Sequence, residues 1–186
     1  DFKRLGRPRL FFGVAPGCMD SMVNKYTAAR RLRSEDAYSP DGRHDMRPEY
    51  PTIVYTQILR QLYPDVPVVL GGIEASLRRV MHFDYWQERF RPSILVDSNA
   101  DMITYGMGEK PTIELCRRLT DALEESHPSL YYDENGYSYI TRDTFRHVAQ
   151  LENEIPQTVS LYDYSHIPGG IRANDIVLHS YEKCLK

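Results

Sequence analysis

The sequence predicts an α/β domain built on a short, mostly parallel β-sheet. Two apolar runs, residues 66–70 and 101–105, each end at a glycine turn that leads into an apparent helix. Short apolar runs that contain β-branched residues and are bounded by glycine are typical of strands buried on both faces, as in parallel sheets. Ligands of such sheets bind beyond the carboxyl ends of the strands, so the two turns mark a candidate crevice.

Length and composition narrow the possible functions. The chain has 186 residues, of which 41% are hydrophobic and 26% charged, and its formal net charge is −3. This is enough for one core, with or without an appendage, and the small net charge gives no reason to expect a nucleic-acid partner. No apolar stretch approaches the ~20 residues of a membrane span, so we expect no membrane partner.

The cysteines argue against a disulfide framework. Cys18, Cys116 and Cys184 are odd in number, lie far apart and form neither a CxxC pair nor a compact metal-binding pattern. We therefore expect no metal site and a reducing, cytoplasmic compartment. The chain starts at Asp1 and reaches a strand almost at once, which suggests a piece of a longer protein.

The first half of the chain alternates strands and helices. Residues 9–14 predict a strand with a turn at 15–17, and Asp20 or Ser21 caps a helix that we expect to reach about Leu32. Residues 33–51 are too polar for a core strand and predict a long irregular loop, which is functional or disordered in compact domains. A helix then starts at Pro51 or Thr52 and stops at Pro64, before the strand at 66–70.

The second half is less regular. Residues 76–91 predict short helix mixed with loop, and residues 94–96 a small strand or a buried turn. After the strand at 101–105, a helix with Pro111 near its start presents an apolar face that includes Leu119 and Leu123.

The chain changes character after Ser126. A hairpin turns at Asn135-Gly136, a polar helix covers about 143–153, and an irregular tail with one edge strand at 176–178 follows. We expect residues 1–125 to form the α/β domain and residues 126–186 an irregular α+β tail.

The glycine turns supply the first candidate site residues. Gly71 and Gly72 permit positive φ and close approach of a ligand, and Glu74 and Ser76 start a helix whose free N–H groups favour an anion. A tight strand-to-helix turn is the structural alternative.

Gly106, Gly108 and Glu109 repeat this pattern one strand later. Glu109 contacts a ribose hydroxyl or simply favours the positive end of the helix dipole. Neither turn matches G-x-G-x-x-G or a P-loop, so a standard dinucleotide site is not supported.

A cluster of charged and aromatic residues lies between the two turns: Arg78, Arg79, His82, Asp84 and Trp86. Paired arginines between aromatic walls suit recognition of a carboxylate or phosphate. The alternative is a domain-docking surface in which Phe83 and Trp86 are buried and the arginines solvated. No nucleophile, base and acid occur together, so no catalytic residue is predicted.

Several runs resemble the YgiQ-type family of uncharacterised radical SAM proteins: FKRLGRPRLFFGV (2–14), MDSMVN (19–24), PVVLGGIEASLRR (67–79), HFDYW (82–86) and YGMGE (105–109). The resemblance is close over about residues 1–125. It implies an N-terminal Rossmann-like domain similar to cobalamin-binding domains, followed by a radical SAM barrel. In that barrel a CxxxCxxC motif would hold a [4Fe–4S] cluster that binds and cleaves S-adenosylmethionine to give the 5′-deoxyadenosyl radical.

This chain departs from the family pattern because it lacks both the CxxxCxxC motif and the first strand of the cobalamin-binding-like domain. The cluster and S-adenosylmethionine are therefore implied only for the full-length protein. Cobalamin is not implied, because no Asp-x-His-x-x-Gly motif is present.

The resemblance predicts a recognition domain of a radical SAM enzyme of unknown substrate, with the barrel of the same polypeptide as partner. Two alternatives are a structural lid that binds no ligand, and a flavodoxin-like binder of a nucleotide tail. An open crevice lined by polar groups would favour recognition, and a filled, apolar one would favour the lid.

Overall fold

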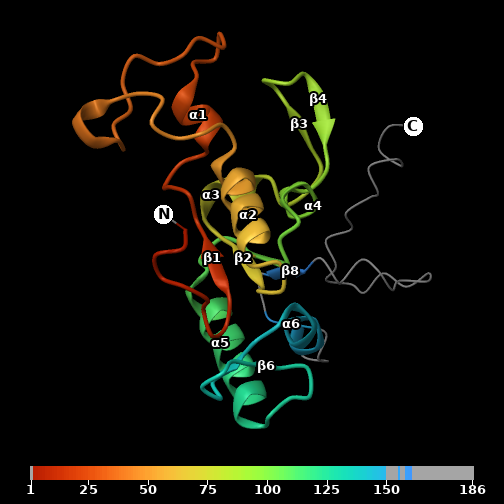
Figure 1. Ribbon diagram of the computed structural model, residues 1–186. Coiled ribbons are helices and arrows are strands. Elements are labelled where there is room, and N and C mark those ends of the chain that lie inside the picture. The colour runs from red at the N-terminus through yellow and green to blue at the C-terminus, as the bar shows by residue number, and fades with distance from the viewer. Residues whose placement is uncertain (1, 150–154, 156–157, 161–186) are drawn as a thin grey trace, which may run out of the picture.

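The computed structural model describes residues 2–149, 155 and 158–160. Its central sheet has three parallel strands, β1 (Phe12–Val14), β2 (Val68–Leu70) and β5 (Met102–Thr104), in that spatial order. A fourth strand, β8 (Thr158–Ser160), pairs antiparallel with β5 and gives the order β1-β2-β5-β8. Figure 1 labels β1, β2 and β8 of this sheet. The predicted α/β class with a short, mostly parallel sheet is confirmed.

Strands β2 and β5 are buried on both faces, as their composition predicts. In β2, Val68 and Leu70 pack into one hydrophobic cluster while Val69 packs into another on the opposite face of the sheet. Met102 and Ile103 of β5 divide in the same way, because successive side chains of a strand point to opposite faces.

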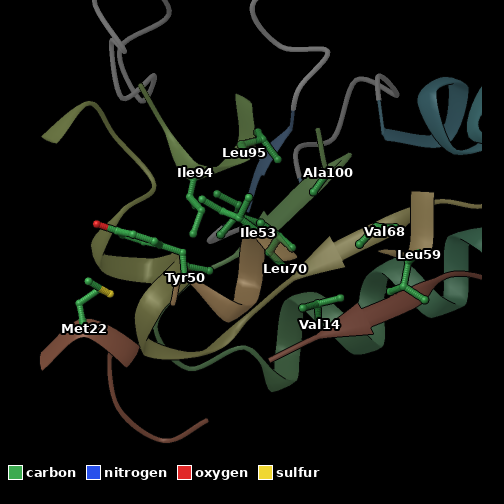
Figure 2. Close-up of a cluster of buried hydrophobic side chains, with 12 residues drawn as sticks. Val14, Met22, Tyr50, Ile53, Leu59, Val68, Leu70, Ile94, Leu95 and Ala100 are labelled. Atoms are coloured by element: carbon green, nitrogen blue, oxygen red, sulfur yellow. The ribbon is translucent and has the colours of Figure 1, made fainter. Parts of the chain in front are cut away.

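Helices cover both faces of the sheet. The first cluster is closed by α2 (Pro51–Leu62), α3 (Gly72–Leu77) and α4 (Ile94–Ser98), and Figure 2 shows Ile53 and Leu59 of α2 near Leu70 and Val68 of β2. The second cluster is closed by α5 (Glu109–Glu124) and α6 (Arg142–Ala149).

The helix expected up to Leu32 is much shorter. Helix α1 (Ser21–Lys25) ends where Tyr26 becomes extended, and Tyr26 forms an antiparallel bridge with Leu32. Arg30 adopts φ 58°, which an α-helix does not allow, and the chain reverses there. The loop that follows contains one 3₁₀ turn, η1 (Pro40–Gly42), and reaches α2 through Tyr50 in the left-handed region.

Two short elements differ from expectation. Residues expected as helix and loop instead form a hairpin of β3 (His82–Asp84) and β4 (Arg89–Arg91), whose alternating polar and aromatic residues suit strands. Residues 94–96 belong to α4, because the Ser93 hydroxyl accepts the Leu95 N–H and caps a single helical turn.

The region after residue 126 shares a core with α5. The hairpin of β6 (Tyr131–Tyr132) and β7 (Ser138–Tyr139) is as expected, and α6 begins close to the predicted start. Ile140 and Phe145 pack in the same cluster as Leu115 and Leu119. The expected strand at 176–178 and the end of the helix at 153 lie outside the described residues, and the domain boundary at residue 125 stays a prediction.

None of the helices in the described part of the chain combines the length and apolar character that a membrane span requires.

Candidate functional site

The two glycine turns meet at one edge of the sheet. A Cβ added to Gly71 or to Gly108 would lie 3.5 Å from the same atom, Oγ1 of Thr104. The Gly106 N–H donates to the Ser76 hydroxyl at 3.3 Å, and this hydroxyl donates to the Gly72 carbonyl at 2.8 Å. The turns are therefore adjacent, as parallel strands require, and Ser76 bridges the space between them.

The exposed side chains at this edge are mainly apolar. Ile73, Leu77 and Met107 have exposed fractions of 47%, 60% and 73%. Across the described sheet, each strand comes later in the sequence than the strand before it, in the order β1-β2-β5-β8. The described sheet therefore has no point at which the strand order reverses. Such a reversal is where open α/β sheets usually form a ligand crevice.

The Glu74 side chain points into the molecule and not toward the solvent at the glycine turns. Its side chain is buried, with Oε2 accepting the Ser21 N–H at 2.9 Å and Oε1 accepting the Thr52 N–H at 3.3 Å. These N–H groups belong to the first turns of α1 and α2, so one carboxylate caps two helices and joins both to α3.

Arg78 is also buried and fully engaged. Its Nε and Nη2 donate to the two carboxylate oxygens of Asp20 at 2.9 and 3.0 Å. Asp20 accepts the N–H groups of Met22 and Val23 as well and so caps α1. A bidentate pair of this kind fixes the orientation of both side chains, which makes it a strut between α1 and α3.

Asp84 extends this network to the hairpin. The Tyr50 hydroxyl donates to Asp84 Oδ2 at 2.6 Å, and Nη1 of Arg78 lies 3.6 Å from the same oxygen. The Tyr50 ring has the guanidinium groups of Arg78 and Arg91 each 5.0 Å from its centroid.

The surroundings of Asp84 and Tyr50 shift the pKa of each group. Burial acts to raise the pKa of Asp84, but hydrogen bonds from Tyr50 and the backbone outweigh it and hold the pKa below its usual value. Burial and the Asp84 carboxylate both raise the pKa of Tyr50.

Three further candidates are half-buried. His82 contacts the Val80 carbonyl through Nδ1 at 3.2 Å, and burial lowers its pKa. Arg79 donates to the Ser76 carbonyl at 2.5 Å and lies over the Tyr105 ring at 4.9 Å. Trp86 packs edge-on against Tyr85, with ring centroids 5.6 Å apart.

The structure thus divides the predicted site residues. Glu74, Arg78 and Asp84 meet in one buried network, whereas Gly72, Gly106 and Glu109 are exposed at the sheet edge. Sequence reasoning missed Asp20 and Tyr50 as partners of Arg78 and Asp84. Arg78 lies 58 residues from Asp20, and Asp84 lies 34 residues from Tyr50, so no local spacing in the sequence connects the partners.

Two hollows lie away from the glycine turns. A cavity of about 20 Å³, with room for roughly one water, lies between α1 and the polar loop and is lined by residues that include Ser21, Lys25 and Arg47. A shallow groove of about 510 Å³ near α6 is lined by residues that include Asp65, Thr141 and Arg142.

The described residues do not fit an iron–sulfur cluster. Cys18 is exposed, Cys116 is partly buried, and both are free thiols; Cys184 lies outside the described residues. Within the described part of the chain, no three His, Cys, Asp or Glu side chains are arranged to hold a metal ion. A [4Fe–4S] cluster requires three or four converging thiolates.

Comparisons with known proteins give one family model and several relatives that match all or most of the chain. The family model described as Radical SAM N-terminal matches residues 1–186. A UPF0313 protein of Bacteroides thetaiotaomicron is 55% identical over 185 residues, covering 100% of this chain and 27% of the relative. One from Porphyromonas gingivalis is 58% identical over 82% of this chain and 25% of the relative.

The UPF0313 protein YgiQ of Escherichia coli is 59% identical over 64% of this chain and 16% of its own length. The chain thus spans about a quarter or less of these curated relatives. No solved structure matches it significantly. Because the family model covers every residue, the chain belongs to the radical SAM N-terminal family.

Proposed function

We propose that this chain is a non-catalytic accessory domain that docks as a lid on the radical SAM portion of a longer polypeptide. The observation that carries this proposal is the arrangement of side chains where the two glycine turns meet. Ser76 bridges the two glycine turns, and exposed Leu77 and Met107 lie at the same sheet edge. An edge whose turns are bridged by Ser76 and which exposes mainly apolar side chains suits packing against protein better than binding of a polar ligand.

The radical chemistry belongs, in this proposal, to the remainder of the polypeptide. Family membership supports a [4Fe–4S] cluster and S-adenosylmethionine there, and the thiols described here do not supply the cluster's ligands. A parallel sheet with helices on both faces supports a Rossmann-like fold that resembles a trimmed cobalamin-binding-like domain.

Substrate recognition is the second candidate function. Arg79 favours it, because its guanidinium lies beside the sheet edge formed by residues 71–72 and 106–108, here called the glycine edge. Its buried Nε has no hydrogen-bond partner among the described residues. With Ser76 and Glu109 it would form a polar rim for a substrate that carries a carboxylate or phosphate.

Two measurements on the full-length protein test the proposal. Anaerobic reconstitution with iron and sulfide should give a cluster that cleaves S-adenosylmethionine, and failure to do so would contradict the radical SAM assignment. Leu77→Glu should then speed protease cleavage between this domain and the remainder, whereas Ile113→Glu, at an exposed position of α5, should not. Equal cleavage rates in both variants would contradict docking through the glycine edge.

A thermal-shift panel of small carboxylates and phosphates separates the two candidate functions. Stabilisation that is lost in Arg79→Gln would support recognition. No stabilisation by any member of the panel is the result expected of a lid.

A further inference from the structure

The β3–β4 hairpin has its two faces reversed relative to an ordinary surface hairpin. Phe83 pairs with Phe90 at its centre and both point outward, with exposed fractions of 54% and 41%. The opposite face carries Asp84, which is buried, His82 and Arg91, which are half-buried, and Arg89, which is exposed. One-sided hairpins normally turn apolar residues to the core and polar residues to water.

A buried hydrogen bond and a partly buried ion pair account for the polar inner face. Asp84 accepts the Tyr50 hydroxyl, and Arg91 forms an ion pair with Asp97 of α4 at 2.7 Å. These contacts satisfy the inward charges, so the hairpin keeps this orientation without any apolar contact from Phe83 or Phe90 to the core.

The tip of the hairpin is anchored as well. The Tyr85 hydroxyl donates to the Ala28 carbonyl at 2.8 Å, and Arg30 pairs with Glu88 at 2.5 Å. Figure 1 shows the hairpin standing away from the central sheet, at the same end of the molecule as α1. The two phenylalanine rings pack edge to face, with centroids 5.4 Å apart. The hairpin that carries them is held by contacts of its tip and of its inner face.

Resting on the proposed function, we infer that Phe83 and Phe90 form a docking contact through which this domain packs on the radical SAM portion of its own polypeptide. Aromatic side chains surrounded by polar ones are typical of the centre of a protein interface. About three quarters of the relative that matches the whole chain lies outside the match, so a large partner surface is available in cis. A covalently linked partner acts at high effective concentration, which favours it over a second copy.

Photo-crosslinking of the full-length protein tests this inference. p-Benzoylphenylalanine in place of Phe83 should, on irradiation, crosslink within one polypeptide to a peptide beyond residue 186. The matched control carries the same group in place of Tyr131 of the β6–β7 hairpin, which is 45% exposed, and should give no such crosslink.

A paired substitution provides an independent readout. Phe83→Glu with Phe90→Glu should raise the rate of protease cleavage between the two portions at least about tenfold, because burial of both rings is lost. Both side chains already face solvent in this domain, so the fold should persist and the far-UV circular dichroism should be unchanged.

Each outcome decides the inference. Crosslinks from position 83 to a second copy, to another protein or to nothing would overturn it. If the cluster forms and Leu77→Glu still exposes the junction while position 83 gives no crosslink, the lid proposal stands and this contact alone is wrong.

Discussion

The carboxylate of Glu74 links the first turns of two helices that lie 22 and 53 residues away in sequence. Arg78, one helical turn later, links Asp20 and Asp84. Glu74 of α3 and Arg78, the residue that follows α3, therefore hold α1, α2 and the β3–β4 hairpin in place around the glycine turns. Charged residues that a linear motif presents as ligand-binding candidates serve here as internal struts.

Replacing Glu74 should lower stability markedly. Glu74→Ala removes the acceptors of two buried N–H groups, and we expect a loss of about 2–4 kcal/mol in the free energy of unfolding. Glu109→Ala is the matched control, since Glu109 is exposed at the start of α5 and its loss should cost less than about 1 kcal/mol. Urea unfolding of both variants gives the comparison, and equal losses would show that Glu74 is not a strut.

His82 should make stability fall between pH 7 and pH 5. Burial lowers the pKa of His82 in the folded protein, so the unfolded chain binds a proton first as the pH falls below about 6.5. The contribution of His82 to folding stability is fully present above the pKa that His82 has in the unfolded chain. It is lost as the pH falls through the lower pKa that His82 has in the folded protein. Unfolding measured at pH 7, 6 and 5 should show a flatter dependence in His82→Gln than in the wild type.

His44 provides the control for this pH dependence because it is exposed. His44→Gln is measured beside His82→Gln over the same pH range. A wild-type slope in His82→Gln would mean that other groups carry the effect.

At the scale of elements, backbone conformation decides where helices begin and end. Helix α1 stops after five residues because Tyr26 takes an extended conformation, and α3 begins directly at a glycine with φ 80°. Gly72 thus starts a helix from a conformation that side chains rarely adopt, with the Ala15 Cβ 3.7 Å from where its own Cβ would lie.

The two adjacent glycines should respond differently to alanine. Gly72→Ala forces a Cβ into the left-handed region and should destabilise by about 1–2 kcal/mol. Gly71 is extended, and its added Cβ would meet Thr104 Oγ1 at an ordinary 3.5 Å, so Gly71→Ala should change stability by less than about 0.5 kcal/mol. Thermal denaturation of both variants tests the difference, and an equally large loss in Gly71→Ala would contradict it.

At the scale of the whole molecule, the sheet separates two clusters that share its strands. Phe145 of α6 is fully buried in the second cluster, and Trp86 packs against the first. Asp101 connects the two sides of residue 125 further, since it accepts hydrogen bonds from Arg60, Arg142 and the Val68 N–H. A core connected in this way should unfold as one cooperative unit.

Phe145→Ala tests this cooperativity. It should lower the free energy of unfolding by about 3–5 kcal/mol through loss of a buried ring. The fluorescence of Trp86, the single tryptophan, should shift its midpoint together with the circular dichroism signal. If Trp86 keeps its wild-type midpoint, residues 1–125 fold independently and the boundary predicted at 125 holds.

The sequence by itself determined the class of fold, the family and the position of both glycine turns. Runs such as residues 68–70 and 102–104 are buried on both faces. This property depends only on consecutive residues, so the sequence alone reveals it. The asparagine–glycine turn at 135–136 is equally local and predicted its hairpin.

Only the tertiary structure decided which charged residues turn inward. Arg78 and Arg79 are neighbours of identical type, yet one is buried against Asp20 and the other lies over Tyr105 at the rim. Their roles depend on partners brought close by the parallel crossovers, and contacts across 58 residues leave no spacing in the sequence. For the same reason the outward aromatic face of the β3–β4 hairpin became visible only once Tyr50 and Asp97 were in place on its other side.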